Sequence, residues 1–266
     1  MKKVALIGCG ALGGIVSRHF ALAGADSWSL EVMMARTPSH AEALAREVGA
    51  RAVASLDELL AEKPDLVIET AGIGAVKEYA ERVLACGADF LMVSVGALAD
   101  KAFYDKLAET ARRSGAHLYI ANGAIGGFDA MRTYCLMGAD EVTITSTKAP
   151  KSLRGAPGLA GRELSETEDE VVFEGSMEEA IRGFPKNVNV GVATAVVTER
   201  ADTTVRIVSR PTAVENGHFI TIKGPRLRAH MEFCSEPDPN NPRSSTSTAY
   251  SVLAFLKNLA SPVVFF

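Results

Sequence analysis

Residues 4–13 read VALIGCGALG, in which a short apolar run leads directly into the pattern Gly-x-Gly-x-x-Gly. The apolar run predicts a buried strand over Val4–Ile7, and the apolar spacing after it predicts a helix over Ala11–Ala23. A glycine turn that joins a strand to a helix is the fingerprint of a dinucleotide-binding βαβ unit. This stretch therefore predicts both the fold of the first half of the chain and a nucleotide ligand.

Each glycine of this turn has a physical role. Gly8 permits the tight turn, Gly10 leaves the backbone open to a pyrophosphate, and Gly13 lets the helix approach the strand. The unpaired amides at the helix start, at Ala11 and Leu12, would then bind the anion without a lysine. The alternative is a glycine turn in a doubly wound domain that binds no ligand.

The end of the second predicted strand, Leu30–Ala35, bears on the choice between NAD and NADP. An acidic residue there would bind the ribose 2′-hydroxyl of NAD, but the sequence continues with Arg36 and Thr37. Arg36 suits a 2′-phosphate, which indicates that NADP is accepted. A guanidinium stacked on the adenine ring would instead leave NAD usable. The expected cofactor is therefore NAD or NADP.

Two further strand ends are expected at the same edge of the sheet. Ala71 and Gly72 follow one predicted strand, and Ser94 and Gly96 follow the next. Ligands of open parallel sheets bind beyond the carboxyl ends of the strands, where small residues let the backbone approach. These four residues are candidate cofactor contacts, although each also suits an ordinary turn.

The first 123 residues alternate short apolar runs with alanine-rich helical segments. Strands are expected at residues 4–7, 30–35, 66–69, 90–93 and 118–120, and helices include 75–86 and 101–114. This βαβ rhythm requires right-handed crossovers, and hence a parallel sheet with helices on both faces. The predicted fold class is α/β, with a doubly wound parallel sheet over residues 1–123.

The rhythm changes after Asn122. Strand-like runs follow at residues 141–147, 171–173, 203–208, 218–223 and 227–233, with few helices between them. They predict a second, α+β domain over residues 124–239 with a mainly antiparallel sheet. Residues 236–243 read EPDPNNPR and predict an ordered turn or linker, and a helix is expected over Ser245–Leu259. We expect residues 240–266 to complete the first domain.

Composition and charge exclude several classes of protein. The 266 residues are 47% hydrophobic, and 28 Lys+Arg against 32 Asp+Glu give a net charge of −4. No basic run suits nucleic acid, no apolar run approaches a membrane span, and the first residues lack the pattern of a signal peptide. Four cysteines without zinc-ligand or disulfide spacing indicate neither a metal site nor cross-links, which fits a reducing cytoplasm.

Several sequence blocks, taken in order, resemble one family. They are GCGALG at residues 8–13, GAIGGFDA at 123–130, FPKNVNV at 184–190, NGH at 216–218 and NPRS at 241–244. The glycine motif is widespread, but the FPKNVNV block followed by the NGH turn is much more specific. Over essentially its whole length the chain resembles the L-aspartate dehydrogenases that supply a quinolinate precursor.

The resemblance implies an enzyme that oxidises L-aspartate with NAD(P). The product would be iminoaspartate, which enters pyridine nucleotide biosynthesis or hydrolyses to oxaloacetate and ammonia. The resemblance also implies a homodimer, a Rossmann domain completed by the carboxyl-terminal segment, and a second domain that carries catalysis and dimerisation.

A catalytic histidine at His218 and nicotinamide-side contacts at Ala124 and Asn189 are also implied by the resemblance. A histidine titrates near neutrality and can both accept and release a proton, as dehydrogenation of an amine requires. Of five histidines, His218 alone lies at a predicted junction of a turn with a strand. The alternatives are an exposed turn residue for His218 and a helix cap for Asn189.

Aspartate carries two carboxylates, so its pocket needs cations or amide donors. The candidates are Lys148 at a strand end, Asn187, Arg243 and Ser244. Lys148 and Arg243 also suit a solvated surface, and Ser244 also suits the N-cap of the last helix.

Two rival functions are open. One is a related NAD(P)-dependent oxidoreductase that acts on another amino or keto acid. The other is a dinucleotide sensor without catalysis. For the enzyme, the expected partner is a small-molecule substrate, L-aspartate or oxaloacetate plus ammonia, rather than nucleic acid or a membrane.

Overall fold

The computed structural model describes residues 1–24, 26–185, 188–238 and 241–265. The chain forms two compact units, Met1–Gly123 with Ser247–Phe266, and Ala124–Thr246. We call them the first unit and the second unit. Each contains its own large β-sheet.

The first unit contains a six-stranded sheet in the order β3-β2-β1-β4-β5-β6, and all neighbouring strands are parallel. The strands are β1 (Lys2–Ile7), β2 (Trp28–Met34), β3 (Arg51–Val53), β4 (Leu66–Glu69), β5 (Asp89–Met92) and β6 (Leu118–Ile120). The strand order reverses at β1, so the carboxyl ends of β1 and β4 border the switch point where doubly wound sheets bind ligands. The predicted fold class of the first half is confirmed.

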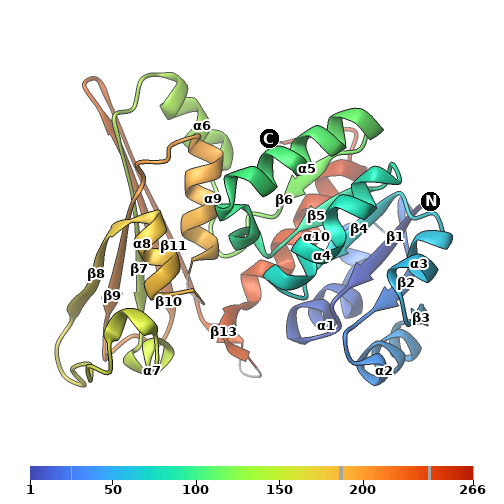
Figure 1. The fold of residues 1–266 in the computed structure, drawn as a ribbon, viewed down its shortest axis with the longest axis horizontal. Helices are drawn as coiled ribbons and strands as arrows, with labels where there is room; N and C mark the ends of the chain where they lie inside the picture. Colours follow the sequence, from blue (N-terminus) through green and yellow to red (C-terminus); the bar gives the residue numbers. More distant parts are fainter. Residues whose placement is uncertain (25, 186–187, 239–240, 266) are drawn as a thin grey trace. The chain divides into compact units, whose positions relative to one another are not determined.

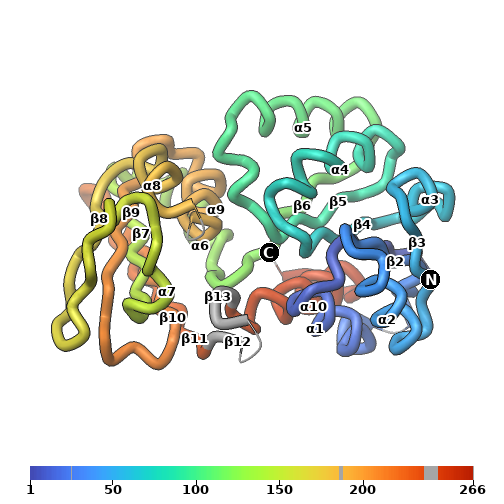
Figure 2. Tube along the Cα trace, turned by 60° about the horizontal axis from the view of Figure 1, so that its bottom comes forward, coloured from blue at the N-terminus to red at the C-terminus, as the bar shows by residue number. Residues whose placement is uncertain are grey.

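Helices cover both faces of this sheet. They are α1 (Ala11–Arg18), α2 (Pro38–Val48), α3 (Leu56–Ala61), α4 (Ile73–Ala85), α5 (Lys101–Ser114) and α10 (Thr246–Ala260), with 3₁₀ helices η1 (Phe20–Ala23) and η2 (Val95–Ala99). Figures 1 and 2 show α4 and α5 side by side on one face, with α1, α2 and α10 on the other.

Helix α10 comes from the far end of the chain and packs into the core of the first unit. Val252 and Leu256 are fully buried in the same apolar cluster as Val16 of α1. The indole N–H of Trp28 donates a hydrogen bond to the carbonyl oxygen of Leu256 at 3.0 Å. The carboxyl-terminal helix is therefore an integral part of the first unit.

The second unit contains a five-stranded sheet in the order β11-β10-β7-β9-β8. Its strands are β7 (Glu141–Lys148), β8 (Glu170–Ser176), β9 (Thr204–Ser209), β10 (Asn216–Gly224) and β11 (Leu227–Ser235). Only β7 and β9 pair in parallel, and the other three pairings are antiparallel. The predicted α+β class with a mainly antiparallel sheet is confirmed.

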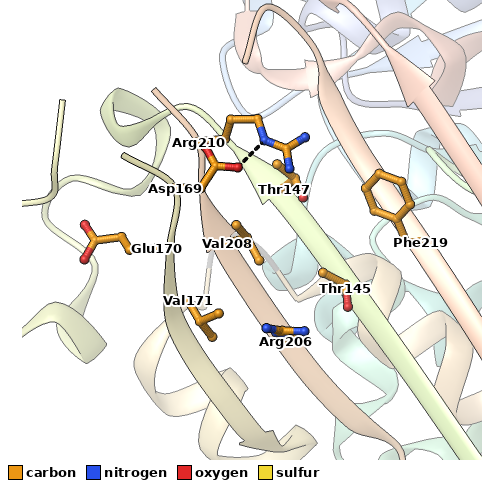
Figure 3. Close-up of a pocket in the computed structure, with 9 residues that line it drawn as sticks. All are labelled: Thr145, Thr147, Asp169, Glu170, Val171, Arg206, Val208, Arg210 and Phe219. Atoms are coloured by element: carbon orange, nitrogen blue, oxygen red, sulfur yellow. Dashed lines mark hydrogen bonds and ion pairs between the residues drawn. The ribbon is translucent and has the colours of Figure 1, made fainter. Parts of the chain in front are cut away.

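The two faces of this sheet differ. Helices α6 (Phe128–Leu136), α8 (Met177–Gly183) and α9 (Asn189–Thr198) pack on one face, which we call the covered face (Figure 1). The shorter helices α7 (Pro150–Leu153) and η3 (Pro157–Leu159) lie in the connection between β7 and β8. Alternate residues of β7 and β9 point to the covered face and are buried, whereas Thr145, Arg206 and Val208 point to the opposite, open face (Figure 3).

Two local features of the first unit differ from expectation. Strand β3 was not predicted, because it has only three residues and Arg51 is exposed, so it lacks an apolar pattern. The helix expected over Ala11–Ala23 ends at Arg18, and Phe20–Ala23 form a 3₁₀ helix before Gly24, which has φ of 103°. Such tightening is common at helix ends.

The segment expected to be an ordered turn or linker contains two short strands. Strand β12 (Pro237–Asp238) pairs antiparallel with β13 (Asn241–Ser245). Proline is tolerated there because a two-stranded ribbon has two edge strands and no central one. Helix α10 then begins at Thr246, so Ser245 directly precedes it and Ser244 does not.

Candidate functional site

The glycine turn after β1 has the geometry that a dinucleotide needs. Gly8 has φ of 108°, and a Cβ there would lie 2.6 Å from the amide nitrogen of Ala71. A Cβ on Gly13 would lie 1.9 Å from the carbonyl oxygen of Gly8. A Cβ on Gly10 would meet no atom within 4 Å. Packing therefore demands glycine at Gly8 and Gly13, whereas Gly10 opens onto free space, so the turn fits a pyrophosphate close to its backbone.

Helix α1 begins at this open position. Its N-cap is Gly10, which has no side chain to bond the first amides, and its first turn has no acidic residue. Ala11 and Leu12 are half-buried. The amides at a helix start lack carbonyl partners within the helix and carry partial positive charge, so they suit an anion.

Arg36 and Thr37 lie just beyond the carboxyl end of β2 and are both exposed. Thr37 is the N-cap of α2, although its side chain makes no capping hydrogen bond. Among the described residues, none forms a hydrogen bond or ion pair with the guanidinium of Arg36. The cation is thus available to a phosphate or an aromatic ring of a ligand.

A buried carboxylate ties together the two other strand ends. Glu69, the last residue of β4, is 0% exposed. Its Oε1 accepts hydrogen bonds from the amides of Ala71 and Gly72, both at 2.7 Å, and from the hydroxyl of Ser94 at 2.8 Å. Its Oε2 accepts from the Ser94 amide at 3.0 Å. Burial raises the pKa of Glu69, and these hydrogen bonds oppose that rise.

The candidate cofactor contacts Ala71, Gly72 and Ser94 therefore all bind Glu69. The hydroxyl of Ser94 is bound to Glu69, so Glu69 is a partner of Ser94 that our sequence interpretation missed. The detectable signal was an acidic residue in an otherwise apolar four-residue strand. Gly96 is buried in η2, and Gly72 has φ of 121°, which favours glycine.

His218 in the second unit is the third residue of β10 and only 4% exposed. It is therefore not an exposed turn residue. Its Nδ1 lies 3.0 Å from the hydroxyl oxygen of Ser146, its cross-strand partner on β7. Burial lowers the pKa of His218 to about 3, and the positive charge of Lys148 adds to this shift. The imidazole is consequently neutral at physiological pH.

Lys148 is the last residue of β7 and is 8% exposed. It is therefore not a solvated surface charge. Burial lowers the pKa of Lys148 to about 8. Within the residues that the structure describes, no hydrogen bond or ion pair reaches its ammonium group. Lys148 also lines a cavity of about 90 Å³ together with Lys151 and Arg154. A buried ammonium without a counter-ion is costly, and a bound carboxylate would offset that cost.

The other predicted contacts of the nicotinamide and of the substrate lie at several places in the second unit or outside the described residues. Ala124 is half-buried, and Asn189 is the exposed first residue of α9. Asn187 lies outside the described residues. Arg243 and Ser244 lie in β13, but their side chains are not described. The structure thus brings His218 and Lys148 together in the second unit, and the glycine turn and the ends of β4 and β5 together in the first.

Family comparisons match two successive parts of the chain. The family described as "Homoserine dehydrogenase, NAD binding domain" matches residues 8–121, and "Aspartate dehydrogenase, C-terminal" matches residues 129–259. An L-aspartate dehydrogenase of Methanospirillum hungatei is 37% identical over 99% of both chains. The chain belongs to the L-aspartate dehydrogenase family. Another member, from Methanocaldococcus jannaschii, is 36% identical over 99% of this chain and 98% of its own.

A solved structure supports the same family. The crystal structure of aspartate dehydrogenase from Thermotoga maritima covers 100% of both chains with a TM-score of 0.75 and 26% identity. The resemblance stated from the sequence blocks is therefore confirmed. As a member of the L-aspartate dehydrogenase family, the chain is an oxidoreductase that uses NAD or NADP.

The described residues show neither a membrane-spanning helix nor a cluster of metal ligands. No described helix has both the length and the hydropathy that crossing a bilayer requires. Among the same residues, no group of three or more His, Cys, Asp or Glu side chains is arranged to hold a metal ion.

Proposed function

We propose that this chain oxidises L-aspartate with NAD(P)⁺ to iminoaspartate, NAD(P)H and a proton, and that water then converts iminoaspartate to oxaloacetate and ammonia. The reaction is reversible. The observation that carries this proposal is the buried ammonium of Lys148, which has no partner among the described residues and lies beside the buried imidazole of His218, in a chain of the L-aspartate dehydrogenase family. Together they supply a cation for a carboxylate and a group that accepts a proton.

The first unit would hold the dinucleotide, with residues 1–123 and 240–266 as the dinucleotide-binding domain. Gly8, Gly10 and Gly13 would shape the pyrophosphate site, while the amides of Ala11 and Leu12 bind its charge. When bound, NAD(P)⁺ supplies the hydride acceptor for the Cα hydrogen of aspartate.

Other residues of the first unit would complete the cofactor site. Arg36 and Thr37 would contact the adenosine part of the dinucleotide. The backbone of Ala71, Gly72, Ser94 and Gly96 would line the site at the ends of β4 and β5. These assignments follow from the position of all six residues at the carboxyl edge of the sheet.

Residues 124–239 would form the catalytic and dimerisation domain, with His218 as the general base. When Nδ1–H donates to the Ser146 hydroxyl, Nε2 has a free lone pair for a proton from the substrate ammonium or from the attacking water. The charge of Lys148 disfavours an imidazolium before substrate binds. Two substrate carboxylates would offset that charge and make His218 a stronger base.

Further contacts are assigned from the resemblance. Ala124 and Asn189 would contact the nicotinamide side of the cofactor. Lys148, Asn187, Arg243 and Ser244 would bind the substrate carboxylates. Lys148 has the strongest structural support, because it is buried and no described residue serves as its counter-ion.

We expect a cytoplasmic homodimer that contributes to pyridine nucleotide biosynthesis. The open face of the second unit supports self-association, because none of the described helices packs on it and a pocket of about 340 Å³ indents it. Figure 3 shows Phe219, Val208 and Val171 on this face, beside the ion pair of Arg210 with Asp169.

The experiment is a substrate panel with purified protein, NAD⁺ or NADP⁺, and individual amino acids, followed by absorbance at 340 nm. L-Aspartate should support reduction of the nucleotide, whereas His218→Ala should lower kcat by about 10²–10⁴ without changing nucleotide affinity. Reduction with a different amino acid only would favour a related dehydrogenase. Nucleotide binding without any reduction would favour the sensor.

A further inference from the structure

A second polar residue lies unpaired beside Lys148. Ser209 is the last residue of β9 and is 0% exposed, and its hydroxyl has no hydrogen-bond partner within the described part of the chain. In the parallel register of β7 with β9, Ser209 lies directly beside Lys148. Both side chains are buried at the covered face, near the same end of the sheet as His218.

The polar neighbours of Ser209 and Lys148 are already engaged. Glu170, the partner of Ser209 on β8, accepts from the Ser165 amide at 2.8 Å and pairs with Arg162 at 3.4 Å. Ser146 is bonded to His218. Hence no described carboxylate serves as counter-ion to Lys148, and no described acceptor serves the hydroxyl of Ser209.

Two adjacent buried donors without an acceptor are unfavourable, since each has lost its hydrogen bonds to water. One carboxylate satisfies both, because its two oxygens can accept from the ammonium and from the hydroxyl at once. An amine cannot do so, because it would bring a second positive charge to Lys148.

We propose that Ser209 and Lys148 together bind one carboxylate of the substrate, beside His218 on the covered face. This inference rests on the proposed function, which it deepens by adding Ser209 as a substrate-binding residue. The hydroxyl of Ser209 donates to one carboxylate oxygen, and the ammonium of Lys148 donates to the other. The two donors would therefore already be in position before the carboxylate binds.

The test uses succinate as the probe, because it has both carboxylates of aspartate but no amine to oxidise. Binding is measured by calorimetry on the full chain saturated with NADH. The variants are Ser209→Ala and Lys148→Met, with Thr212→Ala as the matched control. Thr212 is exposed and lies three residues beyond Ser209 in the connection to β10.

Ser209→Ala should weaken succinate about tenfold, the effect of one lost hydrogen bond to a charged group, and raise the KM for L-aspartate equally. Lys148→Met should weaken succinate at least about 100-fold. Thr212→Ala should bind as wild type, and NADH affinity should be the same in all four proteins. Because Ser209→Ala removes an unpaired buried hydroxyl, its melting temperature should equal or exceed that of wild type.

The outcomes separate this inference from the proposed function. Wild-type succinate affinity in Ser209→Ala, or no succinate binding by the wild type, would overturn the carboxylate site even if aspartate is oxidised. If aspartate is not oxidised but succinate binding depends on Ser209 and Lys148, the carboxylate site stands and the proposed function fails.

Discussion

At the scale of single residues, the buried charge of Lys148 lowers the stability of the fold but is expected to favour binding of the substrate. Its folded-state pKa is about 8, lowered by burial from 10.5. The unfolded chain therefore holds the proton more tightly, so stability is reduced in full below pH 8 and recovers as pH rises toward 10.5. A residue kept at this cost is expected to bind an anion.

We therefore predict that Lys148→Met stabilises the fold while it abolishes aspartate turnover. At pH 7 the free energy of unfolding should rise by about 1–2 kcal/mol, because a buried charge with no partner among the described residues is replaced by an apolar chain of similar volume. Urea unfolding at pH 7 and pH 10 measures this difference, which should shrink at the higher pH. A variant less stable than wild type at pH 7 would contradict the account of Lys148.

Arg36 is the residue that we expect to decide between NADP and NAD. If its exposed guanidinium binds a 2′-phosphate, Arg36→Ala should raise the Kd of NADP about tenfold or more and leave that of NAD nearly unchanged. Equal loss for both nucleotides would instead indicate stacking on adenine. Fluorescence titration with NADPH and NADH measures both constants, and exposed Arg46 of α2 provides the control variant Arg46→Ala.

At the scale of elements, Glu69 joins two loops that strand pairing alone does not hold together. Its carboxylate links the start of α4 to the connection between β5 and η2. Within the described residues, the backbone amides of Ala71, Gly72 and Ser94 have no acceptor other than Glu69, and a carboxylate with two oxygens serves several donors at once.

Glu69→Gln should therefore loosen both loops. The amide group would turn one acceptor into a donor that faces backbone N–H groups, so we expect a loss of about 2–3 kcal/mol in stability and roughly tenfold weaker NADH binding. Thermal unfolding and NADH titration measure the two effects. Glu42→Gln, at an exposed position of α2, is the matched control. Wild-type values in Glu69→Gln would show that the loops do not depend on the carboxylate.

Individual elements also differ in how well the sequence predicts them. Strand β4 and helix α5 were predicted at their observed bounds, because a continuous apolar run and a helical repeat are local signals. Strand β3 is too short to carry such a signal. Ser146 and Ser209 were missed for another reason: each is a small polar residue in a strand, and its importance appears only when strand register places it beside His218 or Lys148.

At the scale of the whole molecule, the open face of the second unit is where we expect two copies to meet. Val171 of β8 is 43% exposed on this face, beside Val208 (Figure 3). Stable association buries about 800 Å² on each partner, and an open sheet face of five strands offers a broad surface for it.

A charge on this face should therefore prevent dimerisation. Val171→Lys would bury an unpaired ammonium at each copy of the interface, which costs about 3 kcal/mol or more and should weaken the dimer at least about 100-fold. Sedimentation velocity over a range of concentrations measures the dimer dissociation constant. Val214→Lys is the matched control, because Val214 is 80% exposed and belongs to the connection between β9 and β10, not to a strand of the sheet. If both variants are dimers like the wild type, the copies meet elsewhere, whereas a monomeric wild type would refute the homodimer itself.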